Sequence, residues 1–292
     1  MSTYLKDYIV AAKTGDYARA PLSGLIVNSR PDPAVLEYLR QELDAASSED
    51  REAIVDLLVK LGLEAEPLTS RGAEVLRNQQ IIGILAGPAL ARDDIGRYAA
   101  MDALRKLVTH ADLALHEDAI VRALLAAPSE EAFLLAAKAK PLKERVLVEQ
   151  LARSPEWKEV EAAKIVRAAL GAKEIEDGFL SRVDEAKDGK GLVDALGPLA
   201  LMGTPRSLKA IAVRLRTPLT IIIPTVYEKS VRLNVLEALL YNFPDQPVLY
   251  PNNIITEEDY RAAERFCTES LGVTYTTPPP PFITYRGFPR FE

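Results

Sequence analysis

The chain has 292 residues, 48% of them hydrophobic and 27% charged, and its formal net charge is −6 at pH 7. This composition is typical of a folded protein and excludes global disorder. The acidic balance disfavours a broad nucleic-acid surface, because such surfaces gather lysine and arginine. The single cysteine, Cys267, excludes an internal disulfide and a zinc site built from cysteines.

No stretch of the sequence approaches the roughly 20 apolar residues that are needed to cross a bilayer. The first residues also lack the basic region, apolar run and small-residue cleavage site of a secretory signal. We therefore expect a cytoplasmic protein that does not associate with a membrane.

Apolar residues at helical spacing, set between capping residues, recur along most of the chain. Ser47 with Asp50 resembles a capping box, and Gly62 is a natural helix end. Ser154 followed by Pro155 is a strong helix start. The helices expected on this basis span residues 3–14, 33–43, 47–61, 71–86, 94–108, 118–126, 133–140, 142–152, 154–170, 191–201, 204–215, 228–243 and 256–271.

Leucines recur along these helices with a long and nearly constant period. The second helices of successive pairs share one leucine at steps of 43 to 47 residues, and the first helices share another at similar steps. The two series are Leu58, Leu104, Leu151, Leu196 and Leu239, and Leu43, Leu85, Leu125, Leu170 and Leu215. Together they predict an all-α fold of about five antiparallel helix pairs across residues 1–243.

Two segments interrupt this period, and the composition then changes near the C-terminal end. Residues 133–140 predict an extra helix, whereas residues 219–223 are β-branched, flanked by prolines, and predict an extended connection. Eight of the 20 prolines lie in residues 244–292. That second region predicts one more helix and an extended tail, since the four prolines at 278–281 favour polyproline II.

Two of the second helices share further positions. Each places an arginine seven residues before a buried leucine that follows an alanine, and residues 50–58 match this pattern in part. The segments are Asp94, Arg97, Ala100, Ala103 and Leu104, and Val231, Arg232, Val235, Ala238 and Leu239. They resemble the second helix of a HEAT repeat, including its Val-Arg and Ala-Leu positions. The resemblance to HEAT and armadillo arrays covers about residues 30–243 and implies an α-solenoid superhelix with a continuous core.

Arg51, Arg97 and Arg232 occupy equivalent positions in this pattern and are candidate partner-binding residues. Tyr98, beside Arg97, is grouped with them. A ladder of guanidiniums along one side of the array could grip an acidic partner. The alternative, which we favour, is that each arginine pairs with a carboxylate in a neighbouring turn, such as that of Asp50, Asp94 or Glu228.

The aromatic residues of the tail are the second group of candidate binding residues. They are spaced by three residues and interleaved with arginines: Phe282, Tyr285, Phe288 and Phe291. They form either a strip that covers the last helices or a docking peptide for another protein. We favour the covering strip, because exposed aromatic side chains lower solubility and terminal repeats need a cap.

Motifs for catalysis or metal binding are not evident in the sequence. His110 and His116 lie near acidic residues, but the segment is better explained as a loop between repeats. The chain has no nucleophile elbow, no H-E-x-x-H and no phosphate-binding glycine loop. We therefore expect no metal and no cofactor.

The resemblance implies a non-catalytic scaffold or adaptor that binds a protein partner on the concave face of its superhelix. The alternative is a repeat-fold enzyme, resembling the HEAT-like DNA glycosylases or the HEAT-like bilin lyases. The glycosylase alternative needs a basic concave face, which an acidic chain does not favour.

Overall fold

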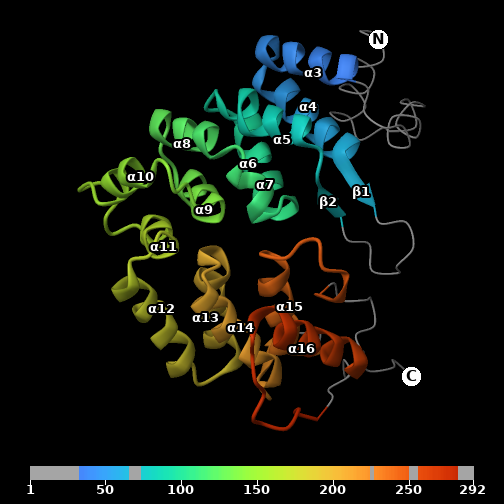
Figure 1. Ribbon diagram of the computed structural model, residues 1–292, viewed down its shortest axis with the longest axis vertical. Coiled ribbons are helices and arrows are strands. Elements are labelled where there is room, and N and C mark those ends of the chain that lie inside the picture. Colours follow the sequence, from blue (N-terminus) through green and yellow to red (C-terminus); the bar gives the residue numbers. More distant parts are fainter. Residues whose placement is uncertain (1–32, 66–73, 224–226, 250–255, 282–292) are drawn as a thin grey trace. The chain divides into compact units, whose positions relative to one another are not determined.

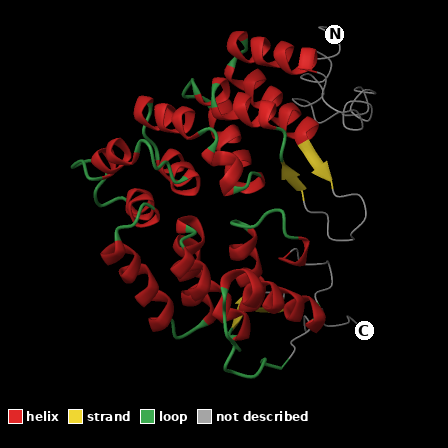
Figure 2. Ribbon diagram, viewed as in Figure 1, coloured by secondary structure: helices red, strands yellow, loops and turns green. Residues whose placement is uncertain are grey.

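The computed structural model describes residues 33–65, 74–223, 227–249 and 256–281, and in these the fold is all-α (Figure 1). Short two-stranded pairings are its only strands (Figure 2). Two of the expected features, the helix at 3–14 and the aromatic residues from 282 onward, lie outside the described residues. The helices are α3 (Pro33–Ala45), α4 (Ser48–Gly62), α5 (Gln79–Ala86), η2 (Pro88–Leu90), α6 (Ile95–Leu107), α7 (His110–Ala114), α8 (Glu117–Ala126), α9 (Glu130–Ala139), α10 (Arg145–Ala152), α11 (Glu161–Ala169), α12 (Lys173–Glu185), α13 (Gly189–Met202), α14 (Pro205–Ala212), η3 (Val213–Arg216), α15 (Val231–Leu240), η4 (Pro247–Leu249) and α16 (Glu257–Leu271).

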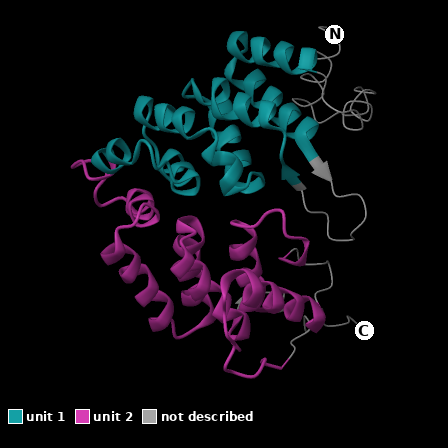
Figure 3. Cartoon of the chain, viewed as in Figure 1, with its two compact units in different colours: residues 1–65, 74–151 teal, residues 66–73, 152–292 magenta. Residues whose placement is uncertain are grey.

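The described residues form two compact units (Figure 3), the first containing 33–65 and 74–151 and the second those from 152 onward. In unit 1, α4 packs against α3 and α6, and α9 packs against α6, α7 and α8. In unit 2, α13 packs against α11, α12, α14 and α15. Helix α16 lies beyond the domain boundary expected at residue 243, and it packs against α14 within unit 2.

Capping residues fix many helix starts where the sequence predicts them. The Ser47 hydroxyl accepts a hydrogen bond from the Asp50 amide at the start of α4. At α16, Thr256 and Asp259 form a full capping box, and Gly272 ends the helix with a left-handed φ of 62°. These contacts are local in sequence, which is why the pattern of residues suffices to predict them.

The strands form two antiparallel pairs. Strand β1 (Leu63–Ala65) pairs with β2 (Glu74–Leu76), and β3 (Thr220–Ile223) pairs with β4 (Tyr227–Ser230). The extended segment expected at 219–223 is therefore confirmed as extended, and it is a strand. The expected helices at 71–86 and 228–243 begin too early, because residues 74–76 and 227–230 are strands.

Two α-helices were missed and one extra helix was confirmed. The segment of His110 and His116 was expected to be a loop between repeats, but His110–Ala114 forms the short helix α7. Helix α12 has no counterpart among the expected helices, because its first turns are strongly acidic and its buried face consists of only Glu176, Phe179 and Val183. The extra helix at 133–140 is confirmed as α9, whose residues Phe133 and Leu135 are buried.

The leucine series are core residues with two exceptions. Eight of the ten leucines are buried. Leu151 is half-buried, and Leu125 is exposed on α8. The prediction that Leu125 lies in the core is wrong, because the buried face of α8 is formed by Ile120, Val121 and Leu124.

No helix in the described part of the chain is both long and apolar enough to cross a membrane.

Candidate interaction site

Arg51 lies in the first turn of α4 and is fully buried, at 0% exposure. Its guanidinium donates hydrogen bonds to the carbonyl oxygen of Leu43 near the end of α3, and to those of Pro88 and Ala89 in η2 at 3.1 and 3.2 Å. Carbonyls at helix C-terminal ends lack intrahelical partners and carry partial negative charge. Arg51 therefore satisfies the ends of two helices at once.

Asp94 supplies the countercharge for Arg51. Its Oδ2 lies 2.8 Å from Arg51 Nε, although neither atom makes a hydrogen bond of good geometry, so the contact is an ion pair. Asp94 is also the N-cap of α6 and accepts from the Arg97 amide at 3.1 Å. A Cβ at Gly96 would lie 2.8 Å from Arg51 Cβ, so the close approach of α6 to α4 requires glycine there.

Arg97, like Arg51, donates hydrogen bonds to carbonyl oxygens at the end of a neighbouring helix. It is 1% exposed, and Nη2 donates to the carbonyl oxygens of Ala123 and Ala127 at the end of α8, at 3.1 and 2.5 Å. Its Nη1 lies 3.5 Å from an Asp93 carboxylate oxygen. Arg51 thus ties α4 to α3 and η2, and Arg97 ties α6 to the end of α8.

Arg232 is also buried but has different neighbours. Its Cζ lies 3.7 Å from the centroid of the Tyr260 ring, and Nη2 lies 3.9 Å from a carboxylate oxygen of Glu264. Both partners belong to α16. Burial lowers the pKa of this guanidinium. Arg232 therefore fixes α16 against α15.

Because all three arginines are buried, they do not form the exposed row of guanidiniums that was considered as a binding site for an acidic partner. Helix-end carbonyls, carboxylates and an aromatic ring occupy the directions in which the guanidiniums point. Arg51 pairs with a carboxylate, as the favoured alternative expected, but that carboxylate belongs to Asp94 at the start of α6 and not to a neighbouring turn of α4. Tyr98 differs from them, because its ring is exposed and its hydroxyl lies 3.5 Å from Asp93 Oδ1.

The segment that follows α16 folds back against unit 2. Val273 is buried, and the Tyr275 hydroxyl donates to the carbonyl oxygen of Ala212 at 3.2 Å. Arg216 donates to the Thr277 carbonyl and holds both carboxylate oxygens of Glu264 at 3.1 and 2.8 Å. Residues 273–277 are thus anchored to α14, η3 and α16.

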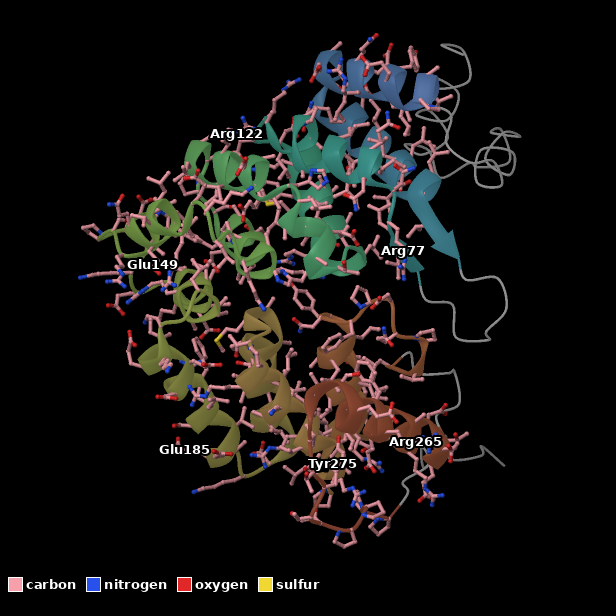
Figure 4. All side chains as sticks on the ribbon, in the orientation of Figure 1. Arg77, Arg122, Glu149, Glu185, Arg265 and Tyr275 are labelled. Carbon is pink, nitrogen blue, oxygen red and sulfur yellow. The ribbon has the colours of Figure 1, made fainter. Side chains whose placement is uncertain are left out.

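A pocket of about 350 Å³ opens beside this anchor and is lined by Arg216, Arg261, Glu264, Arg265, Thr268, Glu269 and Tyr275. Figure 4 labels Arg265, which lies on α16, and Tyr275, which lies in the segment after it. Arg261 pairs with Glu257 and Arg265 with Glu258, both as exposed pairs. Burial raises the pKa of the neighbouring Cys267 thiol to about 11, so this thiol is not an activated nucleophile.

The two histidines have structural partners. His110 Nδ1 lies 2.9 Å from the carbonyl oxygen of Lys138, and His116 Nε2 lies 3.1 Å from Gln79 Oε1. Burial lowers the pKa of both imidazoles. Among the residues that the structure describes, no three histidine, cysteine or acidic side chains are placed to hold a metal ion.

Lys138 is a further buried cation that contacts the end of a helix. Its ammonium donates to the carbonyl oxygen of Arg105 in the last turn of α6. Only 3% of the residue is exposed, and burial lowers its pKa to about 7. The group serves packing at the end of a helix, since the side chain is not open to solvent.

Helix α10 presents an exposed apolar surface that the sequence pattern assigned to the core. Leu142, just before the helix, is 74% exposed, and Val146, one turn later, is 66% exposed, while the adjacent Leu147 is also exposed. Of the residues in α10, only Val148 and Ala152 are buried. Three consecutive apolar residues, 146–148, leave the buried face of α10 ambiguous in the sequence, and of these three only Val148 is buried.

A further leucine lies close to this surface. Glu117, at the start of α8, accepts a hydrogen bond from the Leu142 amide at 3.1 Å and pairs with Lys143 at 3.2 Å. Leu115 lies two residues before Glu117 and is exposed. We call Leu115, Leu142, Val146 and Leu147 the α10 patch.

Comparison with known proteins finds no match: no family model, no curated protein and no solved structure is similar to this chain. The HEAT-like resemblance therefore rests on the residue pattern alone.

Proposed function

We propose that the chain is a cytoplasmic, non-catalytic scaffold or adaptor built from HEAT-like helix pairs, and that it binds a protein partner. The observation that carries the proposal is the α10 patch. Four large aliphatic side chains are exposed there within 33 residues of one another. Exposed apolar patches on folded proteins mark interaction surfaces, because water contact with them is unfavourable.

We propose the α10 patch as the binding surface, which is narrower than the concave face implied by the resemblance. Val146 lies in the first turn of α10, and Leu142 lies in the turn that precedes this helix; both side chains are exposed. Lys143 and Arg145 flank them, paired with Glu117 at 3.2 Å and Glu149 at 2.6 Å. An apolar centre with a charged rim is the usual composition of a protein interface.

The two arginine contacts support the repeat architecture in this proposal. Arg51 and Arg97 occupy matching positions 46 residues apart. Each reaches helix-end carbonyls of the next pair and a carboxylate that precedes or caps α6. A contact repeated at the period of the sequence is expected of stacked units that share one core.

The test compares proteins retained from a host lysate by the wild-type chain and by two variants. Val146→Asp adds a charge in the patch, and Gln80→Asp adds the same charge to an exposed polar site on α5, outside the patch. We expect one protein to be retained by wild type and Gln80→Asp but lost with Val146→Asp. Equal retention by all three would refute the patch, and retention of nothing by wild type would count against an interaction role.

Circular dichroism of both variants serves as the control. Because Val146 and Gln80 are both exposed, neither change is expected to lower the helical signal or the melting temperature.

A further inference from the structure

Four consecutive prolines follow the anchored segment of unit 2, at positions 278–281. Pro278, Pro279 and Pro281 are exposed, and Pro280 is half-buried. The run contains no helix and no strand. Its pyrrolidine rings therefore face solvent along most of its length.

The conformation of this run follows from its composition. Proline fixes φ near −65°, and the described residues contain no cis peptide bond. Consecutive trans prolines adopt polyproline II, a left-handed helix with three residues per turn and no internal hydrogen bonds. Proline has no amide hydrogen, so the run offers only rings and carbonyl acceptors, and it cannot pair with a strand as a donor.

The residues just before the prolines hold the start of the run in place. Arg216 donates to the Thr277 carbonyl oxygen, and its guanidinium lies over the Tyr275 ring at 4.8 Å from the centroid. The same guanidinium is fixed by two hydrogen bonds to Glu264 on α16. The polyproline run therefore leaves the folded unit from a defined point.

We propose that Pro278, Pro279, Pro280 and Pro281 are a docking ligand for a domain that recognises polyproline II through an aromatic-lined groove. Such grooves stack aromatic side chains against pyrrolidine rings and donate hydrogen bonds to the carbonyls between them. The run suits this partner because it is uncharged, exposed and already ordered, so that binding costs little conformational entropy. This site is independent of the α10 patch.

The experiment measures binding of the full chain to immobilised SH3, WW and EVH1 domains, the three classes of aromatic-groove domain, by surface plasmon resonance. The variant Pro279→Ala/Pro281→Ala removes two exposed rings. The matched control is Pro155→Ala, which changes an exposed proline elsewhere in unit 2. A chain that ends at Thr277 removes the run and keeps the anchor.

We expect at least one domain class to bind the full chain and the Pro155→Ala control equally. The double variant should bind roughly tenfold more weakly or worse, since each change removes two ring methylenes from the contact. The truncated chain should not bind. Failure of all three classes to bind, or equal binding by the double variant, would overturn the proposal.

Melting temperatures distinguish docking from a purely structural role of the prolines. The three exposed rings contribute little to the core, so the double variant should melt as the wild type does. Loss of binding that accompanies a large fall in melting temperature would assign the run to the stability of unit 2 instead.

Discussion

Replacing Arg51 by methionine tests whether buried arginines hold successive helices together. The change removes the donors to the carbonyls of Leu43, Pro88 and Ala89 and leaves the Asp94 carboxylate without its 2.8 Å partner. Breaking a buried ion pair by removing one partner costs about 3–5 kcal/mol. We expect the free energy of unfolding of unit 1 to fall by about that amount.

The assay is urea denaturation followed by far-ultraviolet circular dichroism, with Trp157 fluorescence recorded in parallel. Trp157 is the only tryptophan and lies in unit 2, so its signal reports the unit that the change does not touch. Arg145→Met is the matched control. Its pair with Glu149 is solvent-exposed at 2.6 Å, and such pairs contribute under about 1 kcal/mol.

A double variant separates the orphaned charge from the lost hydrogen bonds. Asp94→Asn keeps an oxygen to cap the Arg97 amide and removes the charge. Asp94→Asn should therefore lower the free energy of unfolding less in the Arg51→Met variant than in the wild type. We expect a coupling energy of about 1–3 kcal/mol between the two changes. The reasoning is refuted if Arg51→Met costs no more than Arg145→Met, because the guanidinium would then not be buried among these groups.

The same urea assay checks four further predictions. Arg97→Ala should cost about 2–5 kcal/mol, comparable with Leu104→Ala, because both side chains are buried and the change also removes the donors to the Ala123 and Ala127 carbonyls. Gly96→Ala should cost about 1–3 kcal/mol, because the new Cβ would lie 2.8 Å from Arg51 Cβ. Gly178→Ala, in open space within α12, should instead stabilise the fold by about 0.5–1 kcal/mol. Lys138 has a folded pKa of about 7 against an ordinary value of 10.5, so the unfolded state binds the extra proton between these values. The buried ammonium therefore lowers the free energy of unfolding by its full amount below pH 7, and this loss disappears as the pH rises towards 10.5. The protein should become more stable over this pH range, and Lys138→Met should abolish the increase.

The opposite result in each of these experiments would contradict one feature of the structure. A negligible cost for Arg97→Ala would mean that its helix-end hydrogen bonds do not form. A stabilising Gly96→Ala would mean that α4 and α6 are farther apart than the structure places them. A pH profile of Lys138→Met that matches the wild type would mean that the ammonium stays hydrated.

The sequence alone determined features that depend on neighbours along the chain. Helix content, the caps at Ser47 and Thr256, and the helix end at Gly272 follow from short-range contacts and from backbone conformation. The buried leucines at helical spacing were also predictable, because an amphipathic helix has only one face that it can bury.

Tertiary structure alone decided which ambiguous side chains are buried. The pattern that marks Arg51, Arg97 and Arg232 cannot show what each guanidinium faces, because its partners lie up to 43 residues away in the sequence. The run at 146–148 can bury either face, and only the packing of α10 selects Val148 and exposes Val146. Likewise, residues 220–223 are extended by propensity but become a strand only because residues 227–230 return beside them. Burial is a property of the whole assembly of helices, so these residues required the fold.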